Sequence, residues 1–169
     1  MVKREAYYFI GIGGIGMSSI AKYLVTNNFQ VGGYDLTKTD LTKNLEKSGI
    51  EINYKDEIKS IPLKFKNESV IVIFTPAITM KNKQLVFYKN QGNSIFKRSE
   101  ILGFLIKKFK TIAIAGTHGK TTTAAIVTHL FYKTRQSFTA FVGGILNEFN
   151  SNVIINGNKY AIVEADEYD

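Results

Sequence analysis

The chain has 169 residues, of which 44% are hydrophobic, a formal net charge of +8 and no cysteine, so disulfide frameworks and thiolate chemistry are excluded. No apolar run approaches the ~20 residues that a membrane helix needs, and a strand follows closely after Met1, so we expect a cytoplasmic protein without a signal peptide or a membrane partner. The cations are mostly scattered lysines, whereas nucleic-acid surfaces favour arginine, so we expect no nucleic-acid partner.

The first predicted strand, residues 7–10, leads directly into a glycine-rich loop. The loop fits the pattern G-x-G-x-x-G, and its glycines are Gly11, Gly13, Gly14 and Gly16. Glycines in this pattern permit a tight turn and a close approach of the backbone to a diphosphate. We therefore expect a diphosphate-containing ligand at this loop.

A helix is predicted at residues 17–26 and a second strand at 30–34, which ends at Asp35 about 20 residues after the loop. A carboxylate at this point can accept hydrogen bonds from ribose hydroxyls, and it completes the nucleotide-binding half of a Rossmann-like unit. Asp35 could instead be a plain surface turn residue. The pattern does not identify which diphosphate ligand binds.

Strands and helices continue to alternate as far as residue 106. We predict a helix at 40–47, strands at 50–54, 69–74 and 94–96, and helices at 82–91 and 99–106, the last capped by Ser99. This order predicts a five-stranded parallel sheet with helices on both faces and with ligands beyond the carboxyl ends of its strands. The loops expected to face the nucleotide are residues 11–16, 35–37 and 75–78.

A second unit is predicted to begin after a lysine-rich linker near residues 107–110. An apolar strand at 111–114 runs into the sequence Ala-Gly-Thr-His-Gly-Lys-Thr-Thr-Thr of residues 115–123, and a helix follows at 121–131. Strand, glycine loop and helix in this order are typical of a phosphate-binding P-loop, although Ile114 replaces the first glycine of the strict pattern. The fold class that we predict is therefore α/β, with a Rossmann-like parallel-sheet domain followed by the start of a P-loop ATPase domain.

The residues of this loop predict the chemistry of a nucleoside triphosphate site. Gly116 and Gly119 allow backbone N–H groups to turn toward phosphate oxygens, and the dipole of the following helix adds to their attraction. Lys120 can reach the β- and γ-phosphates, and the Thr121 hydroxyl is placed to bind Mg²⁺.

Further strands are predicted at residues 138–142, ended by two glycines, and at 160–163. Glu164 follows the last strand directly and is our first candidate for a Mg²⁺ ligand, because this ion prefers oxygen ligands. Asp166 and Glu167 are candidates for positioning water near the ion. The acidic segment could instead be a surface turn.

Three segments together resemble the Mur ligase family, namely residues 11–18, 116–123 and 164–167. The resemblance covers the whole chain, including the sequence Arg-Ser-Glu of residues 98–100. It implies that residues 1–107 form a Rossmann-like domain that binds a UDP-sugar instead of NAD. It also implies that residues 108–169 form an incomplete first part of the family's central ATP-binding domain.

The resemblance favours the family member that adds L-alanine to UDP-N-acetylmuramate over the relative that recycles murein tripeptide. It implies that ATP phosphorylates the muramoyl carboxylate and that the amine of L-alanine attacks the resulting acyl phosphate. Since the chain stops inside the acidic segment, the resemblance also leads us to expect a truncated ligase that is inactive alone.

Functional positions of the family correspond to matching residues of this sequence. The resemblance assigns ATP to Gly116, Thr117, His118, Gly119, Lys120, Thr121 and Thr122. It assigns Mg²⁺ to Thr121 and Glu164, and catalysis to these two residues with Lys120. It assigns the UDP-sugar to Gly11, Gly13, Gly14, Gly16, Asp35 and Thr75. At Thr75 the sequence departs from the double serine that the family more often has, and no role for His118 follows from its chemistry.

Two other functions remain open at this stage. An NAD-dependent oxidoreductase or redox-sensing module would use the first glycine loop and Asp35, but it would leave the second loop without a purpose. A nucleotide-gated switch or carrier ATPase would use the second loop alone, and it would leave the first unexplained.

Overall fold

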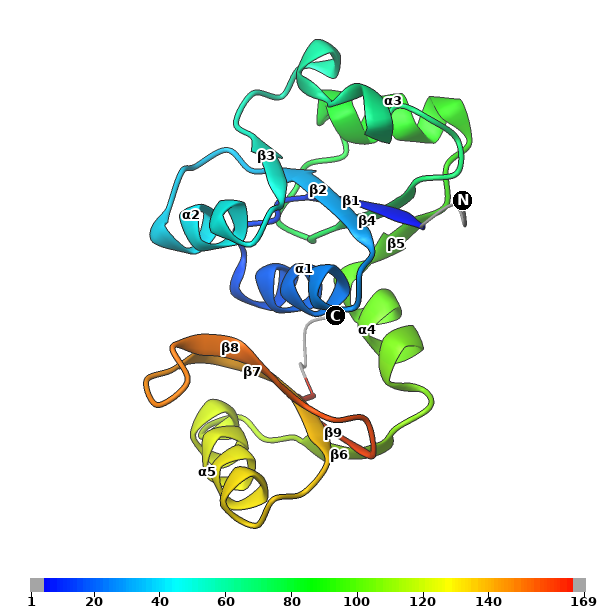
Figure 1. Ribbon diagram of the computed structural model, residues 1–169. Coiled ribbons are helices and arrows are strands. Elements are labelled where there is room, and N and C mark those ends of the chain that lie inside the picture. Colours follow the sequence, from blue (N-terminus) through cyan, green and yellow to red (C-terminus); the bar gives the residue numbers. More distant parts are fainter. Residues whose placement is uncertain (1–4, 166–169) are drawn as a thin grey trace. The chain divides into compact units, whose positions relative to one another are not determined.

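The computed structural model describes residues 5–165, and the chain divides into two compact units, Met1–Ile101 and Leu102–Asp169 (Figure 1). The structure divides the chain after Ile101, whereas we predicted the division after residue 107. Asp166 and Glu167, the candidates for positioning water, lie outside the described residues. Within residues 5–165, no helix combines the length and the apolar character needed to span a membrane.

Unit 1 is built on a five-stranded parallel sheet. In chain order its elements are β1 (Ala6–Ile10), α1 (Ile15–Thr26), β2 (Gln30–Tyr34), α2 (Asp40–Lys47), β3 (Glu51–Asn53), the short helices η1 (Ile58–Ser60) and η2 (Leu63–Phe65), β4 (Ile71–Phe74), α3 (Lys83–Gln91) and β5 (Ile95–Lys97). The helix α4 (Arg98–Ile106) begins in unit 1 and continues past Ile101 into unit 2. The strand order is β3-β2-β1-β4-β5, with every neighbouring pair parallel. The predicted Rossmann-like class is confirmed. The chain leaves β1 first toward β2 and later returns to β4, so the ligand crevice of this topology lies beyond the carboxyl ends of β1 and β4.

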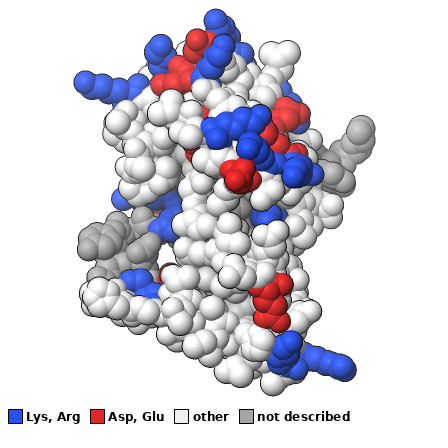
Figure 2. Space-filling view, turned by 90° about the vertical axis from the view of Figure 1, so that its left-hand side faces the viewer, with Lys and Arg blue, Asp and Glu red and all other residues white. Residues whose placement is uncertain are grey.

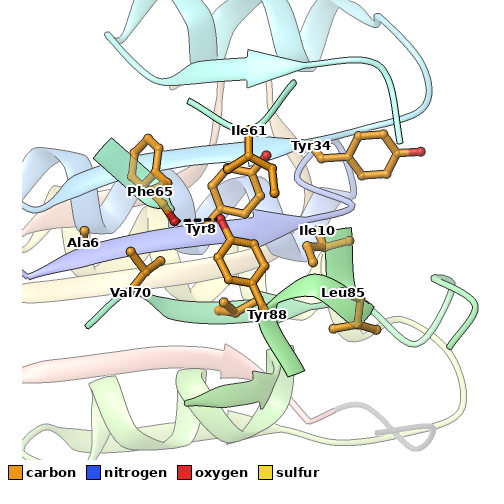
Figure 3. Packing of buried hydrophobic residues seen from close by; sticks show 10 residues of the cluster. Ala6, Tyr8, Ile10, Tyr34, Ile61, Phe65, Val70, Leu85 and Tyr88 are labelled. Atoms are coloured by element: carbon orange, nitrogen blue, oxygen red, sulfur yellow. Dashed lines mark hydrogen bonds between the residues drawn. The ribbon is translucent and has the colours of Figure 1, made fainter. Parts of the chain in front are cut away.

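The core of unit 1 centres on the aromatic side chains of Tyr8, Phe65 and Tyr88, which are fully buried (Figure 3). The Tyr8 ring lies 5.4 Å from the Phe65 ring and 5.3 Å from the Tyr88 ring, and the Tyr88 hydroxyl donates to the Phe65 carbonyl at 3.0 Å. Such tilted aromatic packing stabilises the face of the sheet. Gly32 in β2 leaves the space that the Phe65 ring occupies, since an ideal Cβ there would lie 2.4 Å from that ring.

A buried polar network ties α3 to this core. The Tyr8 hydroxyl donates to Gln84 Oε1 at 2.8 Å, and Gln84 Nε2 donates to Asn53 Oδ1 at 2.9 Å and to the Lys55 carbonyl at 2.8 Å. Burial raises the pKa of the Tyr8 hydroxyl, so the group stays protonated and can donate. A buried network of this kind is stabilising only while each member keeps its partners.

The N-terminus of α4 corrects one expectation. The helix begins at Arg98, so Ser99 lies inside its first turn and is not its cap. The Glu100 carboxylate instead accepts the N–H of Lys97 at 2.7 Å. This contact is the glutamate half of a capping box, in which the third helical residue reaches back to the residue before the helix.

After the end of α4, the described part of unit 2 consists of one helix and a four-stranded mixed sheet. Its elements are β6 (Lys110–Ile114), α5 (Lys120–Lys133), β7 (Phe138–Leu146), β8 (Ser151–Asn156) and β9 (Tyr160–Glu164). The strand order is β6-β9-β7-β8, in which β9 pairs in parallel with both β6 and β7. One face of α5 packs on the sheet through the buried Ala124, against Phe138 and Ile162.

Two expectations for unit 2 were wrong. β7 does not end before its two glycines but continues to Leu146, with a register shift between Phe141 and Leu146. The strand β8 was missed, and its pairing with β7 is antiparallel. A glycine pair inside a strand often marks a bulge and not a strand end, and such a bulge is what lets β7 continue into a hairpin.

We predict that Gln84→Leu destabilises the protein by about 2–4 kcal/mol, because it removes the acceptor of the buried Tyr8 O–H and the donor to Asn53 Oδ1. Urea unfolding followed by circular dichroism measures the change. The matched control is Asn90→Leu on the exposed side of the same helix, which we expect to stay within about 0.5 kcal/mol of the wild type. Equal stability of both variants would contradict the role given to the network.

Candidate functional site

The glycine-rich loop of unit 1 turns sharply at the end of β1. The N–H groups of Gly11 and Ile12 both donate to the Tyr34 carbonyl, at 2.8 and 3.0 Å. Gly11 has a φ of +86°, which residues with side chains rarely adopt. Gly14 is the N-cap of α1, so the positive end of this helix lies at the loop, where it favours an anion.

The Asp35 carboxylate holds this loop in place. Its Oδ2 accepts the N–H of Gly13 at 2.7 Å, and its Oδ1 accepts the N–H of Thr37 at 3.0 Å. Both carboxylate oxygens therefore bind backbone of unit 1, and the residue is half-buried. Asp35 is thus more than a surface turn residue, whereas its contact with a ribose stays a prediction.

Two further side chains reach the loop from neighbouring strands. An ideal Cβ on Gly11 would lie 2.4 Å from Thr75 Cγ2, and one on Gly16 would lie 2.4 Å from Arg98 Nη1. Thr75 therefore covers the start of the loop, and the Arg98 guanidinium lies against the first turn of α1. The structure brings the predicted UDP-sugar residues together and adds a cation that sequence reasoning did not assign.

A simple rule connects these residues. Gly11, Asp35, Thr75 and Arg98 each directly follow a strand, namely β1, β2, β4 and β5. The carboxyl ends of parallel strands meet at one edge of a sheet, so residues at these places converge. A residue that directly follows a strand of this sheet is therefore a candidate for the site. For the strand predicted at 94–96, this criterion selects residues close to Arg98.

The phosphate loop of unit 2 joins β6 to α5. Gly119 is the N-cap of α5 with a φ of +77°, and Gly116 has a φ of +141°, so both positions need glycine. Lys120 is the first residue of the helix, and its Nζ donates to the Gly116 carbonyl at 2.7 Å. The ammonium group thus lies over the loop from which it would contact phosphate.

Thr121 and Glu164 meet beside this loop. The Thr121 hydroxyl donates to Glu164 Oε2 at 3.0 Å, and Glu164 Oε1 accepts the N–H of Gly143 at 2.7 Å. A hydroxyl and a carboxylate this close are hard oxygen ligands of the kind that Mg²⁺ takes together with phosphate oxygens and water. The donor set therefore fits the expected ion.

The remaining predicted ATP residues have no defined side-chain role in the structure. Thr117, His118 and Thr122 are exposed. Their assignment to ATP stays a prediction. The face drawn in Figure 2 carries interspersed blue and red side chains.

Comparisons with known proteins identify similar chains. The family model described as "Mur ligase family, catalytic domain" matches residues 6–110. UDP-N-acetylmuramate–L-alanine ligases of Cytophaga hutchinsonii and Christiangramia forsetii are 47% and 46% identical to this chain, over 98% and 96% of its length. The chain spans 36% of the length of these curated relatives.

Solved structures agree with this result. The crystal structure of UDP-N-acetylmuramate-alanine ligase MurC from Thermotoga maritima has a TM-score of 0.87 and 33% identity, over 96% of this chain and 37% of its own. A Neisseria meningitides ligase named for UDP-N-acetylmuramate and L-alanyl-gamma-D-glutamyl-meso-diaminopimelate has a TM-score of 0.88 over 98% of this chain and 54% of its own. At 22% identity, this second likeness concerns the fold alone.

We predict that Asp35→Ala accelerates hydrogen exchange of the Gly13 amide by about 10- to 100-fold, because a hydrogen bond to a charged group contributes about 1.5–3 kcal/mol. Exchange followed by NMR measures this amide directly. Asp40→Ala, an exposed aspartate at the start of α2, is the control and should leave Gly13 unchanged. Unchanged exchange in both variants would show that Asp35 does not hold the loop.

Proposed function

This chain belongs to the Mur ligase family, and from that premise we propose that it carries the UDP-sugar and Mg–ATP sites of a ligase that joins L-alanine to UDP-N-acetylmuramate. The names of its relatives support this choice of substrates. The chain spans 36% of their length. We therefore propose that this chain binds the UDP-sugar and Mg–ATP, and that the complete reaction needs a protein of the full length of these relatives.

One observation carries the proposal, namely the Thr121–Glu164 pair beside the phosphate loop. An ordinary dinucleotide-binding module has no need of a second loop with a lysine, a hydroxyl and a carboxylate arranged for a triphosphate and its metal. A simple ATPase switch has no need of the glycine loop that Asp35 holds. A ligase that activates a sugar-nucleotide carboxylate with ATP needs both.

Each proposed role follows from the chemistry of the residue. Backbone N–H groups around Gly116 and Gly119 would bind phosphate oxygens, and Lys120 would balance the charge that develops as the γ-phosphoryl group leaves. Thr121 and Glu164 would hold Mg²⁺, which supplies Lewis-acid stabilisation of the phosphates when it is bound.

The proposed reaction has two steps, phosphorylation of the muramoyl carboxylate and attack by the amine of L-alanine. The muramoyl carboxylate accepts the γ-phosphoryl group of ATP and becomes an acyl phosphate, and ADP is released. The amine of L-alanine then forms a C–N bond with the carbonyl carbon, the C–O bond to phosphate breaks, and the amine loses a proton. Activation is necessary because a free carboxylate is a poor acceptor for an amine.

In unit 1, the proposed ligand is the UDP-sugar. The backbone of residues 11–16 and the N-terminus of α1 would bind the diphosphate, as in other glycine loops that begin a helix. Asp35 would complete the site at the end of β2, and Thr75 would cover the loop at the end of β4.

We predict that isothermal titration calorimetry detects binding of UDP-N-acetylmuramate and not of NADH. Both ligands carry the diphosphate that the glycine loop would bind. We therefore expect the site to distinguish them by the groups that are attached to this diphosphate. Selective binding of NADH would overturn the ligase assignment and favour an oxidoreductase.

For unit 2, we predict that Lys120→Ala weakens Mg–ATP binding by about 10- to 100-fold, because a charge-assisted contact contributes about 1.5–3 kcal/mol. Titration with Mg–ATP measures the change. Lys133→Ala, at the other end of α5, removes an exposed lysine that pairs with Glu148 and should leave the affinity unchanged. Equal losses in both variants would contradict a specific role for Lys120.

A further inference from the structure

We propose that Gly143 is a positioning residue for the metal site, which holds Glu164 in the orientation that a Mg²⁺ ion requires. The inference rests on the proposed function of unit 2. It assigns a role to one of the two glycines in β7, which neither the motifs nor the comparisons explain.

The Glu164 carboxylate is held from two sides. Thr121 of α5 donates to Oε2 at 3.0 Å, and the backbone N–H of Gly143 in β7 donates to Oε1 at 2.7 Å. Each oxygen therefore has one donor from a different element. Together they fix the rotation of the carboxylate, which a single donor would leave free.

Glycine is needed at position 143 for space. An ideal Cβ there would lie 2.8 Å from Glu164 Oε2 and 3.2 Å from its Cδ, distances that force the carboxylate to move. The φ of Gly143 lies outside the left-handed region, so backbone conformation does not explain the glycine. Gly144 packs next to it, where an ideal Cβ would lie 3.1 Å from Thr121 Cγ2.

The irregular course of β7 makes this contact possible. β7 pairs with β9 as far as Phe141 opposite Val163, and its register with β8 shifts between Phe141 and Leu146. Beyond Phe141 the backbone has left the regular ladder, so the N–H of Gly143 is directed at the Glu164 side chain. Bulges near active sites commonly redirect a group in this way.

We expect a substitution of Gly143 to change the part of the ATP affinity that depends on Mg²⁺. A side chain at position 143 would displace Glu164 while it leaves Lys120 and the loop backbone in place. Partners that orient a metal ligand typically change metal affinity by about 10- to 100-fold when they are altered.

The test measures ATP affinity by calorimetry with Mg²⁺ and with EDTA. We expect Gly143→Ala to weaken Mg–ATP binding by about tenfold and to leave metal-free ATP binding unchanged. The matched control is Gly103→Ala in α4, where nothing lies within 4 Å of the ideal Cβ, and it should change neither affinity. Parallel loss of both affinities in Gly143→Ala, or no loss, would overturn the proposal.

A second variant guards against a general packing defect. Glu164→Asp in the Gly143→Ala background shortens the carboxylate side chain and withdraws it from the added methyl group. We expect this double variant to recover part of the Mg²⁺ dependence, and a further loss instead would count against the steric argument. If the wild-type chain itself shows no Mg²⁺-dependent ATP binding, the proposed function fails, which is a different result from failure of Gly143 alone.

Discussion

Both candidate sites depend on the same interaction, in which a carboxylate at the end of a strand accepts the N–H of a glycine from another segment. Asp35 accepts from Gly13 and Glu164 accepts from Gly143, each at 2.7 Å. In both cases an ideal Cβ on the glycine would lie against a carboxylate oxygen, at 2.7 and 2.8 Å. The close approach of each carboxylate therefore leaves no room for a side chain at the glycine, which lies in the loop after β1 in unit 1 and inside β7 in unit 2.

Strand order decides which segments this interaction can join. In unit 1, β1 lies between β2 and β4, so Asp35 after β2 and Thr75 after β4 flank the loop that follows β1. In unit 2, β9 lies between β6 and β7, so Glu164 at its end meets both the helix that follows β6 and the backbone of β7. A charge-assisted bond to each carboxylate then limits its motion, which is the preorganisation that anion and metal sites need.

Most of the fold and the two loops were predictable, because their signals are local. Apolar runs and glycine patterns give strands and helix starts without knowledge of distant contacts. The continuation of β7 to Leu146 was missed because a glycine pair resembles a strand end, and the difference between an end and a bulge depends on the partner strand, here the equally missed β8. Arg98 and Gly143 were not assigned for a similar reason, since their roles depend on Gly16 and Glu164, which are distant in sequence and near in space.

Net charge and local charges contribute differently to the binding of an anionic ligand. A formal charge of +8 attracts anions in general, but exposed charges interspersed with opposite ones, as on the face in Figure 2, contribute little to a specific site. Arg98 against α1 and Lys120 over the phosphate loop each lie at a helix N-terminus, where backbone donors and the helix dipole would act together on the oxygens of a bound anion. If both loops bind phosphate as proposed, we expect their selectivity to come from the cation and the helix N-terminus that coincide at each loop, and not from lysines elsewhere on the surface.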